Sequence, residues 1–154
     1  MRILYVIALC LLPATALATE GETPFRADSG LTKAEAQLSE GKYMQAMETL
    51  SGVVNRRPGD ADALTYIGFA WLKMGDTDKA QKYIDRALKY DPKHLGANKY
   101  KADIFLMQGK TAQAHEQMQA LRMVCGATDC AEIHALQGQM NRAVHSGAGD
   151  KNEQ

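Results

Sequence analysis

The chain has 154 residues, a length that fits one domain of ordinary size. Its 18 basic side chains balance its 18 acidic ones, which argues against a nucleic-acid binder or a membrane-surface protein that works through a basic face. Hydrophobic residues make up 45% of the chain, as in a globular protein, whereas aromatic residues make up only 6%, which disfavours an aromatic-rich β-sandwich. The composition therefore favours a helical protein.

The first 18 residues have the pattern of an export signal. A short positive start is followed by an unbroken apolar run over residues 3–12. Ala16 and Ala18 then supply the small residues that a signal peptidase reads, so we expect cleavage after Ala18. This apolar run is too short to span a bilayer as a helix, which needs about 20 residues. We therefore expect a periplasmic or secreted mature chain that does not insert into a membrane.

After a linker that we expect to be flexible (residues 19–30), the chain repeats with a period of 34 residues. Leucine, glycine and alanine each recur at this interval: Leu38, Leu72 and Leu106; Gly41, Gly75 and Gly109; Ala46, Ala80 and Ala114. Pro58 and Pro92 have the same separation. A fixed period of this length indicates a repeat architecture, with units at about 27–60, 61–94 and 95–124.

The middle unit contains two stripes of apolar or small residues at helical spacing. The first stripe is Leu64, Ile67, Gly68, Trp71 and Leu72, and the second is Ala80, Ile84, Ala87 and Leu88. Gly75 separates the two stripes, and Pro92 ends the second. Each unit is therefore predicted to be a helix–turn–helix pair.

These residues resemble the signature of a tetratricopeptide repeat, with Leu64 in the column where that family often has tryptophan. The flanking units match more weakly but in phase. The resemblance implies an all-α, right-handed solenoid of about three helix–turn–helix units over residues 31–124. It also implies that the first helices line a concave groove that binds peptides or partner helices, and it implies no chemistry.

Residues 125–145 are predicted to form a cysteine turn and a capping helix. Asp129 is expected to cap the start of this helix. The helix carries a single apolar stripe, made of Ile133, Leu136, Met140 and Val144. A one-sided helix of this kind can cover the apolar end of a solenoid. Residues 146–154 are polar, and we interpret them as a disordered tail.

Cys125 and Cys130 form the most pointed chemical feature of the sequence. Export favours oxidation, so we interpret the pair as a structural disulfide that closes the turn. Two alternatives stay open: a copper or zinc site completed by His134, and a redox-active or free thiol pair. The sequence has no motif for a nucleophilic serine, a zinc hydrolase or a phosphate loop, so we expect neither an enzyme nor a cofactor.

The candidate binding surface is one face of the first helices. Helical spacing places seven residues there: Thr65, Tyr66, Phe69 and Lys73 in the middle unit, and Lys99, Tyr100 and Asp103 in the third. Aromatic residues beside lysine suit an extended peptide or a helix. The alternative is that Tyr66, Phe69 and Tyr100 are ordinary packing between repeats.

The resemblance also bears on the kind of ligand. Chaperone-binding members of the family clamp a C-terminal carboxylate with lysine, arginine and asparagine. Tyr66, Phe69 and Asp103 stand at the matching positions here, so we do not expect that clamp. Asp60 and Asp62 precede a helix, and we interpret both as capping residues.

Three functions are compatible with these patterns. The leading hypothesis is a non-enzymatic, exported scaffold or adaptor that binds a protein or peptide in the groove, as a monomer or with weak self-association. The second is a thiol or metal accessory protein that uses Cys125, Cys130 and His134. The third is a structural assembly subunit that associates through the weak first unit.

Overall fold

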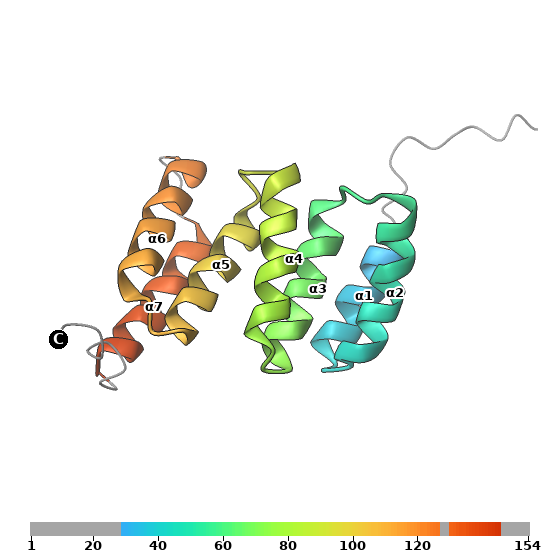
Figure 1. Ribbon diagram of the computed structural model, residues 1–154, viewed down its shortest axis with the longest axis horizontal. Helices are drawn as coiled ribbons and strands as arrows, with labels where there is room; N and C mark the ends of the chain where they lie inside the picture. The colour runs from blue at the N-terminus through green and yellow to red at the C-terminus, as the bar shows by residue number, and fades with distance from the viewer. Residues whose placement is uncertain (1–28, 127–129, 146–154) are drawn as a thin grey trace, which may run out of the picture.

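The computed structural model describes residues 29–126 and 130–145, and within these residues the chain forms seven α-helices and no strand. The helices are α1 (Ser29–Ser39), α2 (Tyr43–Arg56), α3 (Ala61–Lys73), α4 (Thr77–Tyr90), α5 (Leu95–Met107), α6 (Thr111–Cys125) and α7 (Ala131–His145) (Figure 1). The expected export signal, most of the expected linker, Asp129 and the expected tail lie outside the described residues. Because α1 begins at Ser29, the last two residues of the expected linker are helical.

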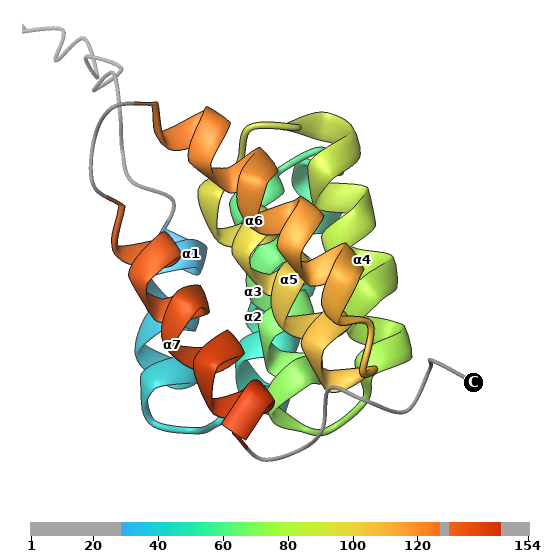
Figure 2. The same cartoon turned by 90° about the vertical axis from the view of Figure 1, so that its left-hand side faces the viewer.

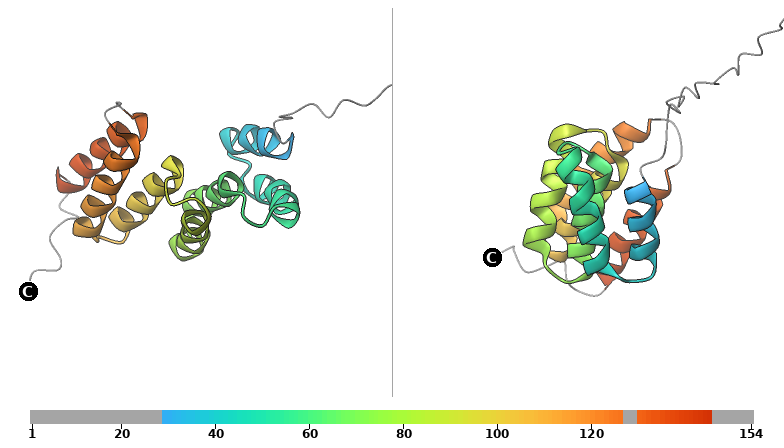
Figure 3. Two further views of the ribbon diagram at one scale, coloured as in Figure 1. Left: turned by 90° about the horizontal axis from the view of Figure 1, so that it is seen from above. Right: turned by 90° about the vertical axis from the view of Figure 1, so that its right-hand side faces the viewer.

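Consecutive helices form antiparallel pairs that stack along the molecule. Contacts are most extensive within the pairs α1–α2, α3–α4 and α5–α6, and fewer contacts join α2 to α3 and α4 to α5. Direct contacts also join α1 to α3, α3 to α5 and α5 to α7, so these helices form one row and α2, α4 and α6 form the other; Figure 2 views the stack along its length. Seen from above, the rows follow an arch with α1 and α7 at its two ends (Figure 3). The expected all-α solenoid is confirmed.

The repeating glycines make the turns inside each pair. Gly41, Gly75 and Gly109 have φ angles of 73°, 83° and 72°, in the left-handed region where side chains other than glycine are strained. At Gly75 the backbone N–H donates to Leu72 O, and the next N–H, of Asp76, donates to Trp71 O, both at 3.0 Å. This pattern satisfies carbonyls at the end of α3 and reverses the chain within two residues. The same local geometry at each glycine explains the constant period.

The close packing of α3 on α4 depends on Gly68. A Cβ atom at this position would lie 2.6 Å from Ile84 Cδ1 and 2.8 Å from Ile84 Cγ1. The absence of a side chain therefore lets Ile84, which is fully buried, lie directly against the backbone of α3.

Helix α7 closes the C-terminal end of the core. Leu136 and Met140 are buried, and they pack in one cluster with Ala102 of α5 and with Met118 and Leu121 of α6. The apolar end left by the last helix pair is thereby covered within the same chain.

Candidate functional site

A hollow of about 440 Å³ lies between α3 and α5, on the row of first helices. Three helices line it: α3 through Phe69, Leu72 and Lys73, α5 through Lys99, Tyr100, Asp103, Leu106 and Met107, and α7 through Gln139. Its volume lies in the range of ligand-binding pockets. Five of the seven residues expected at the binding surface meet here.

One stripe of α3 extends from the hollow towards the start of the helix. Asp62, Tyr66, Phe69 and Lys73 are spaced i, i+4, i+7 and i+11, so they lie on the same face of the helix. Tyr66 lies close enough to Asp62 and to Tyr100 for electrostatic interaction with both. We call the hollow together with Asp62 and Tyr66 the furrow.

Two aromatic rings form the middle of the furrow. The rings of Phe69 and Tyr100 have their centroids 5.2 Å apart and are tilted by 37°. The Lys73 ammonium lies 5.3 Å from the centre of the Phe69 ring, and the Lys99 ammonium lies 4.5 Å from the centre of the Tyr100 ring. Each ring is thus both an apolar contact surface and a partner for a cation.

The two lysines differ in their ionic partners. Lys99 Nζ lies 2.7 Å from Asp103 Oδ2, and both side chains are largely buried. In the described part of the chain, Lys73 has no carboxylate partner, and its side chain is exposed. Asp103 Oδ1, also buried, has no hydrogen-bond partner among the described residues. The Lys99–Asp103 pair is therefore internally neutralised, whereas Lys73 keeps an uncompensated positive charge.

The two tyrosines of the furrow are held in their neutral form. Burial, together with the hydrogen bond that its hydroxyl donates to Glu35 of α1, raises the pKa of Tyr66. Burial, and after it the negative charges of Asp103 and Glu132, raises the pKa of Tyr100. Both hydroxyls therefore stay protonated at neutral pH and can donate hydrogen bonds.

Thr65 does not belong to the accessible surface, which corrects the expectation from helical spacing. Only 1% of Thr65 is exposed, and its hydroxyl has no hydrogen-bond partner in the described chain. Its methyl group instead comes close to α5, since a Cβ atom at Gly96 would lie 3.5 Å from Thr65 Cγ2. Thr65 lies on α3 next to the furrow, but α5 packs over its side chain and buries it.

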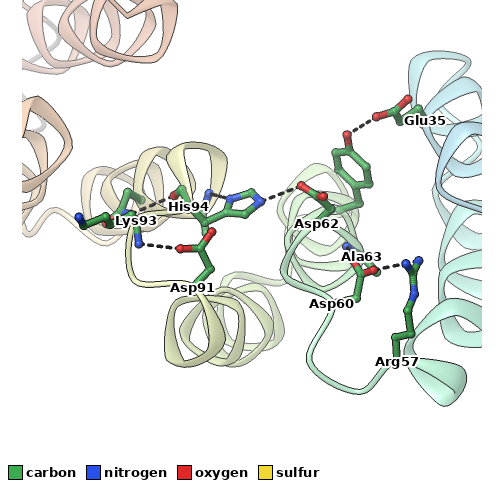
Figure 4. Close-up of polar contacts among 11 residues, drawn as sticks. Glu35, Arg57, Asp60, Asp62, Ala63, Asp91, Lys93 and His94 are labelled. Atoms are coloured by element: carbon green, nitrogen blue, oxygen red, sulfur yellow. Dashed lines mark hydrogen bonds and ion pairs between the residues drawn. The ribbon is translucent and has the colours of Figure 1, made fainter. Parts of the chain in front are cut away.

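The start of α5 is tied to α3 through His94. Its Nδ1 accepts a hydrogen bond from the backbone N–H of Ala97 at 3.0 Å, and its Nε2 lies 2.9 Å from Asp62 Oδ1 (Figure 4). Asp60 caps α3 as expected, because its Oδ1 accepts from the N–H of Ala63 at 2.8 Å. Asp62 does not cap the helix, and it is instead the partner of His94 in the next repeat.

A buried amide network also positions α5. The Asn98 side chain donates to Pro92 O at 3.0 Å and to His94 O at 2.9 Å, and its oxygen accepts from Gln117 of α6 at 2.6 Å. Only 4% of Asn98 is exposed. These bonds fix the turn and the helix that carry Lys99 and Tyr100, so the furrow is built on a rigid base.

Sequence reasoning missed some lining residues. Leu72 was expected only in the core, and Gln139 lies on a helix that was expected only to cap the solenoid. Leu72 lies one 34-residue period before Leu106, which also lines the hollow, so the repeat could have identified Leu72 as a lining residue. No pattern in the sequence around Gln139 identifies it as a lining residue. The position of Gln139 depends on how α7 packs on α5.

The cysteines form a disulfide. Cys125 and Cys130 are bonded, with their Cα atoms 6.2 Å apart. The bond removes both thiolates as metal ligands, and His134 is exposed on the next helix. Among the described residues, no three His, Cys, Asp or Glu side chains are grouped to hold a metal ion.

A second hollow, of about 490 Å³, lies on the opposite row, between α2 and α4. Met44, Met47 and Glu48 line it from α2, Ile67 and Trp71 form part of it from α3, and Tyr83 lines it from α4. Its lining includes no lysine, but the Lys79 ammonium lies 4.1 Å from the centre of the Trp71 ring, so this hollow also has an aromatic ring paired with a cation. None of the helices in the described ranges is both long and apolar enough to cross a bilayer.

The fold and the row of stacked first helices define a helical repeat protein. The family model of the tetratricopeptide repeat matches residues 37–94 and 71–140, so the chain belongs to the tetratricopeptide repeat family. The resemblance expected from the sequence is thereby confirmed.

One curated relative shares sequence with the chain. The rhomboid protease GluP of Bacillus subtilis (strain 168) is 29% identical over 93 residues, which are 60% of this chain and 18% of that protein. The chain therefore spans about a fifth of the relative's length, with 18% covered.

Several solved structures share the fold. The translocator chaperone SycD of Yersinia enterocolitica has a TM-score of 0.67 at 16% identity, covering 77% of this chain and 83% of that chain. The TPR2B domain of yeast Sti1, in a complex with pHsp70, has a TM-score of 0.68 at 17% identity, covering 76% and 94%. The first TPR domain of human RPAP3 has a TM-score of 0.68 at 13% identity, covering 79% and 94%. At these identities the likeness concerns the fold.

Proposed function

We propose that this chain is an exported, non-enzymatic scaffold that binds a peptide segment of a partner protein in the furrow between α3 and α5. The observation that carries the proposal is the hollow of about 440 Å³, whose lining places two tilted aromatic rings beside two lysines. Apolar contact with such rings stabilises a bound side chain, and the flanking polar groups orient it.

The magnitudes favour a modest affinity. Complete burial of one leucine-sized side chain contributes about 1.5–3 kcal/mol, and ordering an extended peptide opposes this gain. The tyrosines lose little conformational freedom on binding, because contacts with Phe69 and with Glu35 already hold them. A single furrow of this kind is suited to reversible binding of a short segment.

Structures with the same fold support the class of ligand. SycD has been solved with a peptide of the translocator YopD, and the TPR2B domain of Sti1 has been solved with pHsp70. We extend this mode of binding to the present chain because its furrow lies between consecutive first helices and carries accessible aromatic residues.

Two features support export. The first is the sequence pattern over residues 1–18, and the second is the Cys125–Cys130 disulfide, since disulfides persist mainly in oxidising compartments. Export places the partner in the periplasm or outside the cell.

Site-specific photo-crosslinking tests the proposal. Met107 lines the furrow and Met44 lines the hollow on the opposite row, and the two are similarly exposed, at 57% and 64%. We replace each in turn with a photoreactive benzoylphenylalanine and irradiate the protein with an envelope extract. A protein adduct that forms from position 107 and is absent from position 44 supports the proposal. Equal adducts from both positions, or adducts from position 44 alone, would contradict it.

A further inference from the structure

The two ends of the furrow carry opposite charges. Asp62 lies in the first turn of α3 and Lys73 in the last, and their separation of eleven positions makes about three full turns. The two side chains therefore lie on one face of the helix, about 16 Å apart along its axis. Tyr66 and Phe69 lie between them on the same face, with Tyr100 against Phe69.

The charge at the Asp62 end is not neutralised. His94 Nδ1 accepts the Ala97 N–H, so the ring proton lies on Nε2 and is donated to Asp62. A neutral imidazole leaves the carboxylate with its full negative charge, and 62% of the Asp62 side chain is exposed. Glu35, on the neighbouring helix, adds a second carboxylate on this side of the furrow (Figure 4).

The charge at the other end is positive. Lys73 is exposed, and its ammonium contacts the face of the Phe69 ring. Lys99 and Asp103 neutralise each other in the middle of the furrow, where the carboxylate of Glu132 also acts on Tyr100. The surface is therefore polarised along α3, from a carboxylate through an aromatic middle to an ammonium.

We infer that the furrow selects an extended peptide segment in which a basic and an acidic side chain flank a short apolar stretch, the basic one against Asp62 and the acidic one against Lys73. An extended chain rises about 3.3 Å per residue, so a span of about 16 Å places the two charged residues about five positions apart. This inference rests on the proposed function, and it adds the charge order of the ligand.

Three acetylated and amidated hexapeptides test the charge order: Lys-Ala-Leu-Leu-Ala-Glu, Lys-Ala-Leu-Leu-Ala-Lys and Glu-Ala-Leu-Leu-Ala-Glu. Each is titrated into the full 15N-labelled chain, and the dissociation constant is taken from the amide chemical shifts. Exposed ion pairs contribute little each, so we expect the mixed peptide to bind about two- to fivefold more tightly than either of the others. Raising the ionic strength should reduce this difference.

Two variants connect the preference to the named side chains. Lys73→Glu should reverse the order of the mixed and the doubly basic peptides. Asp62→Asn keeps an oxygen that can accept the His94 hydrogen bond but removes the charge, so it should weaken the preference for a basic residue at the first end. Lys89→Glu, an exposed change on α4, is the matched control and should leave the order unaltered.

The outcomes separate this inference from the proposed function. If the three peptides bind equally at the furrow, the charge order is wrong and the furrow remains a peptide site. If the doubly basic or the doubly acidic peptide binds best, the polarity is wrong. If none of the three shifts any furrow residue, the charge order and the peptide site both fail.

Discussion

Two neighbouring interfaces of the solenoid use equivalent positions in different ways. Between α1 and α3, the Tyr66 hydroxyl donates a hydrogen bond to Glu35. Between α3 and α5, Tyr100 instead packs its ring on Phe69. Tyr66 and Tyr100 are 34 residues apart, and so are Glu35 and Phe69. The residue at this second position, glutamate or phenylalanine, therefore decides whether the tyrosine forms a hydrogen bond or packs on an aromatic ring.

This comparison shows how a repeat protein acquires a local site. The backbone geometry is the same in each unit because the glycine turns repeat. In the third unit, the position equivalent to Glu35 and Phe69 holds Asp103, which pairs with Lys99. This repeat position therefore gives each unit a different surface, with Glu35 in the first, Phe69 in the second and Asp103 in the third. The furrow lies between the second and third units, where the residue changes from phenylalanine to aspartate.

The largest expected effect on stability comes from the packing of α4 on α3, because α3 takes part in both interfaces. Ile84 is fully buried against Gly68, so Ile84→Ala removes packed methyl groups and leaves a cavity beside α3. We expect the free energy of unfolding to fall by about 2–5 kcal/mol, as measured by urea denaturation. The exposed change Lys89→Ala is the control and should alter stability by less than about 0.5 kcal/mol. A loss for Ile84→Ala as small as that of the control would show that α3 is not held by this contact.

The next effect concerns the last helix of the row, which contributes Gln139 to the furrow. Cys125→Ser opens the disulfide before α7, and for so short a loop we expect a loss of about 2 kcal/mol. The wild-type chain with reductant should lose the same amount. Hydrogen exchange should then increase in α7 and stay unchanged in α1. Unchanged exchange in α7 would mean that its packing on α5 and α6 holds it without the bond.

Exchanging the character of the two interfaces tests the comparison itself. Phe69→Glu gives the second interface the residue of the first, and it removes the ring on which Tyr100 and Lys73 rest. We expect about a tenfold loss of affinity for the Lys-Ala-Leu-Leu-Ala-Glu peptide, which is about 1.4 kcal/mol. The reciprocal change Glu35→Phe should leave this affinity within about twofold, since Glu35 is absent from the hollow's lining and its exposed charge attracts the peptide's lysine only weakly. Equal losses from both changes would contradict the assignment.

The smallest effect concerns the polar bridge between α1 and α3. Tyr66→Phe removes the hydrogen bond to Glu35, and because both groups are partly exposed we expect a loss of only about 0.5–1 kcal/mol at pH 7. The pKa of Tyr66 is raised in the folded chain, so the unfolded chain releases this proton first as pH rises. The contribution is therefore complete below the ordinary tyrosine pKa of about 10 and is lost above it.

Denaturation across the alkaline range checks this sign. The wild-type chain should lose more stability than Tyr66→Phe between about pH 9 and pH 11. Parallel losses in the two proteins would show that the proton of Tyr66 is held no more firmly in the folded chain than in the unfolded one.

The sequence predicts the scaffold better than it predicts the surface. The glycine turns involve residues close in the chain, so spacing alone locates them, and it also places Gly68 and Ile84 on the apolar stripes of consecutive helices. The furrow depends on the separation and rotation of α3 and α5, which α4 separates in the sequence. Thr65 shows the consequence, because it lies beside Tyr66 in sequence and is buried under α5.

The charges of the furrow follow the same rule. Lys99 and Asp103 are four residues apart on one helix, so their pairing could be inferred from helical spacing. The bonds from Tyr66 to Glu35 and from His94 to Asp62 cross between repeats, over 31 and 32 residues. Helical spacing cannot predict such contacts, because they depend on how the fold places successive first helices side by side.

The central claim is that the furrow, and not the hollow on the opposite row, binds a peptide. Chemical-shift mapping with the Lys-Ala-Leu-Leu-Ala-Glu peptide tests this most directly, because Trp71 is the single tryptophan of the chain and lines the other hollow. We predict saturable shifts at the amides of Phe69, Tyr100 and Met107, with the indole N–H signal of Trp71 unmoved. Shifts centred on Trp71 and Met44, with the furrow unchanged, would contradict the claim.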